Sequence, residues 1–580
     1  MNLKKQSLAL AIATVLGLSA SPIALAQTAD QSAEEEGLME EVVVTGVRRS
    51  LMDSAAIKRD ADQIMDAISA EEIGKLPDLN VAEALQRITG VQIGRNDAGD
   101  GSSFQVRGLS QNNVEVNGRS LMGSTSDNRT NTFSAIASSQ FKAIKVIKTP
   151  TADMIEGSLG ATIQLETFKP LDFKEQTIQY NVQGIDNSLN DDLGYTVQGL
   201  YGNNWETGAG RWGIVVNASY EDRTVTTQTG DYNWQPVNNY NQLSNLPTDY
   251  DHTVYRVQQV NFESKPFFFE TFAFDGTISW EPTDDLLFSL SYNRNDQTRD
   301  RFQARILHVG TAGWQRLTAD DLQTATFTRA AQGEMMDDGN GNLVPVTGDL
   351  TRTLIMASTF DHAPNRTAAN YETIETDQEV YGFNAEWTPG DWSIRFDAGF
   401  SETLYDRYNI NTATNWNDPA VGNANRAGWS FNFLQGGDLP AVVPVFYDSS
   451  QNLLDLHSYQ WNNFSARFDI NNLSEDAYKL DFTRNVDFAG FKLHDFGARF
   501  ATREVDRVSD RFMNSGGANL DGIRNLGDME EYQPGFVTDF FGPSDPIFDG
   551  FSGNVPRTWV APKVRNRNFW EEYQNILVPN

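Results

Sequence analysis

The sequence predicts a transmembrane β-barrel that follows a small α/β domain, and three observations lead to this fold class. The chain opens like a secretory signal peptide, no later segment stays apolar for long enough to form a membrane helix, and the part after Leu171 alternates amphipathic strands with turns. Inside a bilayer only helices and closed barrels satisfy all backbone hydrogen bonds. Strands that enter a membrane must therefore close into a barrel.

Residues 1–26 have the order of a signal peptide. Lys4 and Lys5 precede an apolar run over 8–18, and Ala24-Leu25-Ala26 follows as a cleavage site. The run is shorter than the roughly 20 residues that a spanning helix needs. We therefore expect cleavage after Ala26.

Composition excludes several classes of protein. The formal net charge of -33 argues against binding to nucleic acid, which needs a basic face. Cysteine is absent, which excludes disulfides and thiolate metal sites. On a barrel, we expect the acid excess to lie mostly in the loops and the lumen.

Residues 27–52 form a leader that we expect to be flexible, because its first part is small, polar and acidic. Within it, the β-branched run 42–45 follows two glutamates and ends at Gly46, which favours an extended strand. Such a strand is suited to adding itself to the sheet edge of a partner. An ordinary first strand of the next domain fits these residues equally well.

Residues 53–170 are predicted to be a mixed α/β domain. Apolar side chains recur at helical spacing between Asn80 and Ile88, with Asp78 or Asn80 as the cap and Gly90 as the end. Short strands bounded by turn residues follow at 104–107, 114–116, 144–147 and 162–165.

Residues 171–580 are predicted to be barrel strands with long extracellular loops. Two hairpins carry the pattern most clearly, 274–292 with its turn at 281–285, and 381–400 with its turn at 388–391. A soluble sandwich would show the same alternation. Strand lengths of about 10 residues and the contrast between tight turns and long loops favour a membrane barrel.

The long loops are predicted over 224–265, 297–373 and 405–460. Long loops on one rim are where binding sites usually lie. Their aromatic rings are candidates for ligand contact, although rings in loops also serve as packing anchors. The candidates are Tyr232, Trp234, Tyr240, Trp416 and Trp429.

Five sequence blocks in order resemble the TonB-dependent outer-membrane receptors. The first, which resembles the TonB box, is Glu40, Glu41, Val42, Val43, Val44 and Thr45 followed by Gly46. The others resemble the plug domain of that family and lie at 77–93, 104–109, 116–119 and 146–163. The resemblance implies a barrel in the outer membrane, surrounded by lipid and closed by an N-terminal plug. It also implies active transport, in which TonB of the inner-membrane complex pulls the box.

The resemblance also suggests site residues and a substrate. Arg107 and Glu156 are candidates for a charged lock between plug and barrel, with ion pairing inside the plug as the alternative. The ending Pro150-Thr-Ala-Asp-Met-Ile-Glu-Gly157 resembles a subset that is linked to glycan uptake. We therefore expect an oligosaccharide, with a ferric siderophore or haem as the alternative. A secreted β-rich carbohydrate-binding protein is the alternative from another class.

The sequence departs from the family pattern at its end. Barrels of this family have 22 strands and an aromatic-terminated last strand, whereas about a dozen strands are recognisable here and the chain ends at Pro579-Asn580. We therefore expect a truncated barrel. The five histidines are scattered, and no catalytic motif is recognisable, so we expect no enzyme, metal site or cofactor.

Overall fold

The computed structural model divides into two compact units, Met1–Asp53 and Ser54–Asn580. Almost all described residues belong to the second unit. The described residues are 52–61, 63–69, 80–123, 136–190, 192–236, 254–309, 316–317, 322–330, 335–337, 343–345, 348–361, 365–416, 428–445, 452–488, 491–514, 526, 530, 541–549, 552 and 554–562.

The N-terminal domain is built on a five-stranded sheet with the order β1-β6-β7-β4-β5. A separate hairpin pairs β2 with β3. These strands confirm the four that the sequence predicted. Their bounds are β1 Met65–Ser69, β2 Val91–Arg95, β3 Gly101–Val106, β4 Asn113–Val116, β5 Arg119–Ser120, β6 Phe141–Ile147 and β7 Thr162–Thr167.

The predicted helix is present as α3, Val81–Leu85, and Asn80 is its cap, because its side-chain oxygen accepts a hydrogen bond from the Glu83 N–H at 3.1 Å. Gly90 follows at φ +82°, a conformation that favours glycine. Across the described residues, no helix is both long enough and apolar enough to cross a membrane.

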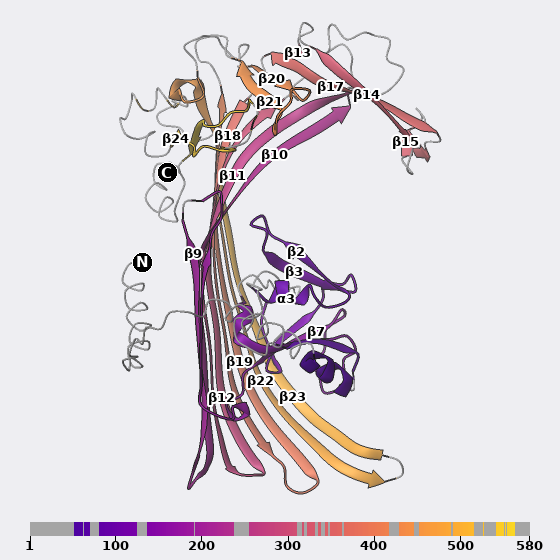
Figure 1. Ribbon diagram of the computed structural model, residues 1–580, viewed down its shortest axis with the longest axis vertical. Coiled ribbons are helices and arrows are strands. Elements are labelled where there is room, and N and C mark those ends of the chain that lie inside the picture. Colours follow the sequence, from indigo (N-terminus) through magenta and orange to yellow (C-terminus); the bar gives the residue numbers. More distant parts are fainter. Residues whose placement is uncertain are drawn as a thin grey trace, which may run out of the picture. The chain divides into compact units, whose positions relative to one another are not determined.

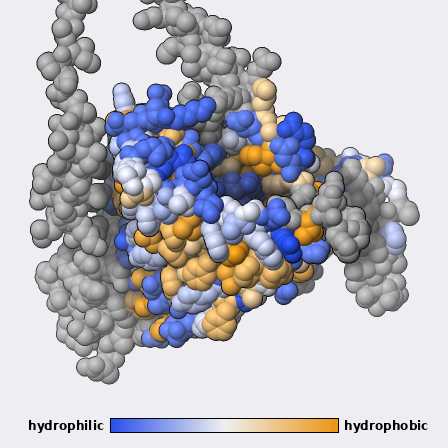
Figure 2. All heavy atoms as spheres, turned by 90° about the horizontal axis from the view of Figure 1, so that it is seen from below, coloured by the Kyte–Doolittle hydropathy of each residue, from blue (hydrophilic) through white to orange (hydrophobic). Residues whose placement is uncertain are grey.

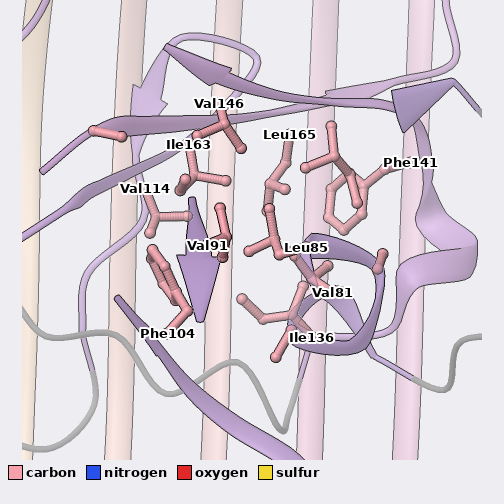
Figure 3. Packing of buried hydrophobic residues seen from close by; sticks show 14 of the residues in the cluster. Val81, Leu85, Val91, Phe104, Val114, Ile136, Phe141, Val146, Ile163 and Leu165 are labelled. Atoms are coloured by element: carbon pink, nitrogen blue, oxygen red, sulfur yellow. The ribbon is translucent and has the colours of Figure 1, made fainter. Parts of the chain in front are cut away.

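The core of the N-terminal domain lies between α3 and the strands (Figure 3). Most of its side chains come from α3 and from β2, β3, β4, β6 and β7, and all members of the cluster are buried. Among those labelled are Val81, Leu85, Phe104, Ile163 and Leu165. The apolar side chains that recur at helical spacing in α3 and at alternate positions in the strands therefore pack together in one cluster.

Glu115 is a carboxylate buried inside this domain. Only 3% of its surface is exposed, Gln164 donates one hydrogen bond at 3.1 Å, and Oε1 has no partner among the described residues. Burial therefore raises its pKa, which the hydrogen bond only partly opposes. A carboxyl whose pKa is higher in the folded chain than in the unfolded chain does not oppose folding at a pH below its unfolded pKa, where it is protonated in both states. As pH rises through the folded pKa, the buried group must ionise and the free energy of unfolding falls.

We expect Glu115→Gln to slow hydrogen exchange in β4 and β7 at neutral pH and to have little effect at acidic pH. Equal effects at both pH values would contradict this.

The rest of the chain forms a 14-stranded sheet of long strands that run side by side (Figure 1). All neighbours pair antiparallel except β11 and β17, which are parallel over two residue pairs. The order runs β8-β9-β10-β11-β12-β18-β19-β22-β23. The bounds are β8 Thr177–Ile185, β9 Gly194–Thr207, β10 Gly210–Pro236, β11 Val254–Thr283, β12 Leu286–Val309, β18 Asn365–Trp387, β19 Trp392–Trp416, β22 Tyr459–Phe488 and β23 Phe491–Asn514.

Shorter strands attach to the ends of the long ones that lie away from the tight turns. β17 pairs with β11, β13, β14 and β20, and β20 pairs with β21. Their bounds are β13 Arg316–Leu317, β14 Gln323–Ala330, β17 Asp349–Asp361, β20 Gly428–Asn432 and β21 Ala441–Val445. Two more pairs form separate two-stranded sheets: β15 Met335–Asp337 with β16 Leu343–Pro345, and β24 Phe541–Pro543 with β25 Val560–Pro562.

Both predicted hairpins are confirmed, as β11 with β12 and β18 with β19. The predicted loops are wrong over much of their length. β10 continues to Pro236, β12 to Val309 and β19 to Trp416, inside segments that were expected to be loops. Beyond the apolar band, both faces of a strand carry polar residues, so the alternation that marks a half-buried strand disappears.

One face of the large sheet, which we call the outer face, carries two rows of aromatic rings. One row lies near the tight turns, where Trp280 stacks on Trp212 at 5.3 Å and on Phe288 at 5.6 Å. The other includes Tyr292 and Tyr381, whose centroids are 4.7 Å apart. Exposed apolar side chains such as Ile278 and Leu290 lie on the same face, and Figure 2 shows apolar surface gathered in patches. Aromatic rows that flank an apolar band are typical of strands in the outer membrane.

Candidate functional site

The opposite face, which we call the inner face, contacts the N-terminal domain. The carbonyl of Met122 accepts hydrogen bonds from Gln378 at 3.2 Å and Thr403 at 3.1 Å, on β18 and β19. The carbonyl of Ser139 accepts one from Asn217 of β10 at 2.9 Å. Val380 of β18 enters the core of the N-terminal domain. The domain is therefore packed against the inner face.

An arginine of the N-terminal domain is seated in a socket of this face. Arg119 forms a bidentate pair with Asp397, at 3.0 and 2.6 Å, and donates to the Ser291 hydroxyl at 3.2 Å. Gly382 and Gly399 leave room for its side chain, because a Cβ on Gly382 would lie 2.1 Å from the guanidinium carbon. Arg119 is 9% exposed. We call these four sheet residues the Arg119 socket.

Local sequence explains why Arg119 reaches the socket. Asn117 and Gly118 both have positive φ, 52° and 81°, between β4 and β5. Two such residues form the tight hairpin turn that an Asn-Gly pair favours. The turn reverses the chain and places Arg119 at the start of β5.

A second ion pair joins the two parts near the tip of the β2–β3 hairpin. Asp100 accepts two hydrogen bonds from Arg223 of β10, at 3.1 and 2.9 Å, and both side chains are almost fully buried. Arg223 also lies over the Phe269 ring at 4.3 Å. Bidentate pairs fix orientation as well as supplying energy. The hairpin tip is thus held at a defined place on the inner face.

The inner face also carries arginines that gather on one carboxylate. Glu372 of β18 is within 3.2 Å of Arg299, 3.6 Å of Arg301 and 2.6 Å of Arg407. Its side chain is 5% exposed, whereas those of the three arginines are 19–32% exposed. We call these four residues the Glu372 cluster. Asp97 of the hairpin tip lies 4.0 Å from Arg301, so the cluster borders that tip.

Comparison with protein families identifies the N-terminal domain. Residues 57–162 match the family described as the TonB-dependent Receptor Plug Domain. Residues 57–162 therefore form a plug domain of the TonB-dependent receptor type. The N-terminal domain is thus a plug, the large sheet is of the outer-membrane β-barrel type, and the proteins that carry such plugs are transport receptors rather than enzymes. A plug of this type is consistent with a place in the outer membrane.

Solved structures similar to the receptor include "Copper transporter OprC", with 14% identity, coverage of 78% of this chain and 76% of the other, and a TM-score of 0.28. The ferric citrate transporter FecA has 9% identity, coverage of 79% and 98%, and a TM-score of 0.26. The ferric preacinetobactin receptor BauA from Acinetobacter baumannii has 8% identity, coverage of 86% and 96%, and a TM-score of 0.25. A search of curated proteins finds no significant match.

The predicted lock residues have other contacts inside the plug. Arg107 sits at φ 54° in a turn, and its guanidinium donates to the Lys148 carbonyl. The carbonyl of Glu156 accepts a hydrogen bond from Asn113 at 3.2 Å. Neither side chain forms an ion pair with any described residue of the sheet, and their role in a lock stays a prediction. The plug residues that do pair with the sheet include Arg119, Asp100 and Asp97, and none of them was singled out from the sequence.

The predicted ligand-contact rings are packed among other rings. Trp416 and Trp429 are 1% and 0% exposed, and they contact Tyr459 and Phe360 at 5.0 and 4.7 Å. Tyr232 and Trp234 are half-buried and pack against Phe433 at 5.1 and 5.2 Å. Tyr240 lies outside the described residues. In this structure the four described rings are packing anchors, and their contact with a ligand stays a prediction.

The predicted TonB box, residues 40–45, and the signal peptide also lie outside the described residues. Their assignment rests on the sequence alone.

Proposed function

We propose that the receptor binds an oligosaccharide above its plug and imports it into the periplasm with energy delivered by TonB. The proposal of energised transport is supported by the plug, which is held on the inner face by the Arg119 socket and by the ion pair between Asp100 and Arg223. A plug fixed by buried ion pairs does not open by itself at an appreciable rate, because removing one partner leaves an uncompensated charge. An external pull must supply the energy.

The TonB box is where that pull would act. Residues 40–45 have the β-branched composition of a strand, and main-chain hydrogen bonds to a sheet edge of TonB would transmit force. Residues 46–52, which follow the box, connect it to the plug along the chain.

An oligosaccharide is favoured by the chemistry of the inner face. Asn370, Asn409 and Asn411 form an amide ladder, in which Asn370 donates to Asn411 at 2.7 Å and Asn411 donates to Asn409 at 2.8 Å. Each amide offers both donors and an acceptor, which matches the mixed character of sugar hydroxyls. The ladder lies beside the Glu372 cluster, because Asn409 donates to Glu372 at 3.3 Å.

Uptake by whole cells tests the proposal. Cells that carry the receptor would be given labelled neutral and uronate-containing oligosaccharides in one set of assays, and radioiron-loaded siderophores in another. We expect an oligosaccharide to accumulate beyond the level in cells without the receptor, and to stop when the proton gradient is dissipated. Energised accumulation of iron alone would replace the oligosaccharide with a ferric siderophore as the substrate.

A further inference from the structure

Charge is sorted between the two faces of the central strands. Side chains alternate along a strand, and the contacts of Asn293, Gln378 and Thr403 with the plug identify the inner face of β12, β18 and β19. By that alternation the inner face has six arginines against three carboxylates: Arg299, Arg301, Arg305, Arg366, Arg395 and Arg407, with Glu372, Glu386 and Asp397. The outer face has one arginine against seven carboxylates: Arg294, with Asp296, Asp300, Glu375, Asp377, Glu379, Glu402 and Asp406.

This distribution is the reverse of what the composition suggests. The chain has a net charge of -33, and we expected part of the acid excess in the lumen. On these strands that expectation is wrong, because the acids lie on the outer face and the inner face is basic. A basic inner face on β12, β18 and β19 in so acidic a protein indicates that this part of the interior meets an anion.

The Glu372 cluster is the most concentrated part of this basic face. Three arginines share one carboxylate, which leaves two positive charges in excess at that point. With the linked groups Lys265, Arg467, Asp97, Glu263 and Asp469, five cations still face four anions. The excess therefore persists in the wider network.

Two donors of the cluster lack acceptors. The Nε atoms of Arg299 and Arg301 are buried and make no hydrogen bond with any described residue, although Nη2 of Arg301 donates to Asn370 at 2.6 Å. Unpaired donors beside excess positive charge are the complement of a carboxylate, which only accepts hydrogen bonds. The arginine side chains are 19–32% exposed, and the cluster borders the tip of the plug through Asp97.

We propose that the Glu372 cluster binds a carboxylate group of the transported substrate, and that Glu372 holds the three arginines in place until the substrate arrives. The inference rests on the proposed transport function and names the substrate class as a carboxylate-bearing ligand. A uronate-containing oligosaccharide and a polycarboxylate iron chelate both supply this chemistry.

Binding to the purified full chain in detergent, measured by titration calorimetry, tests the proposal. The probes are trigalacturonate, its fully methyl-esterified form and ferric citrate, and the ester keeps the sugar skeleton but removes the charge. We expect the acid to bind about tenfold more tightly than the ester, and Arg301→Gln and Arg407→Gln each to weaken acid binding about tenfold. Glu372→Gln removes the competing carboxylate, so we expect it to tighten acid binding severalfold. Arg395→Gln, an exposed inner-face arginine paired with Glu386, is the matched control and should change nothing.

The opposite effects of Glu372→Gln and Arg301→Gln separate ligand binding from a structural role, because structural damage would weaken binding in both. The proposal would be overturned if Glu372→Gln bound the acid more weakly than the unaltered chain. It would also be overturned if the acid and the ester bound with equal affinity and ferric citrate did not bind. If ferric citrate bound with the same pattern across the variants and trigalacturonate did not bind, the Glu372 cluster would be a carboxylate site and the oligosaccharide would be rejected as the substrate. Oligosaccharide uptake that none of the variants alters would reject the cluster and leave the proposed function intact.

Discussion

Asp397→Ala is expected to loosen the plug. Arg119 is 9% exposed and would lose the only carboxylate with which it pairs among the described residues, and an uncompensated buried charge costs about 3 kcal/mol. That energy corresponds to roughly a hundredfold rise in the population of the displaced plug. Hydrogen exchange in β4 and β5 should accelerate accordingly, and single-channel recordings in planar bilayers should show open events that the unaltered receptor lacks.

Gly382→Ala offers an independent route to the same effect. The new Cβ would lie 2.1 Å from the guanidinium carbon of Arg119, so the arginine must leave its place beside Asp397. Because both substitutions break the same contact, the double variant should be little worse than either single one.

Two controls belong to this experiment. Glu386→Ala removes an exposed ion pair with Arg395 on the same pair of strands and should shift stability by less than about 1 kcal/mol. Gly199→Ala adds a methyl group to a barrel strand where nothing lies within 4 Å. If Asp397→Ala behaves like these controls, the socket does not hold the plug.

Local patterns predicted the elements of this receptor well. The spacing of Val81 and Leu85 and the cap at Asn80 define α3, and period-two alternation around two tight turns gave the two hairpins. These features depend on neighbours within a few residues of each other. The family resemblance of the plug blocks rests on the same short segments, which is why residues 57–162 could be assigned from sequence.

Contacts between distant segments could not be predicted in this way. Arg119 and Asp397 are 278 residues apart, and nothing in either neighbourhood marks the other as its partner. The Asn117-Gly118 turn would have placed Arg119 at a hairpin end, but not against the barrel. The sorting of charge between the two faces also needs the register of β12, β18 and β19, which no single strand specifies.

Val43→Pro is expected to abolish energised uptake while leaving surface binding unchanged. Proline has no N–H to donate to a neighbouring strand, so the box could not pair continuously with a sheet edge of TonB. The substitution lies in the leader, outside the plug core and the Glu372 cluster, so a defect in substrate binding is not expected. Thr45→Val, which keeps a β-branched side chain and every backbone hydrogen bond, is the matched control and should preserve uptake.

The most direct test of the account compares accumulation and surface binding of the same labelled substrate in cells carrying the unaltered receptor or Val43→Pro. TonB-driven transport predicts that binding at the cell surface stays equal while accumulation in the variant falls to the level of cells without the receptor. Accumulation that survives the proline unchanged would contradict both the assignment of the box and the claim that this receptor is driven by TonB through it.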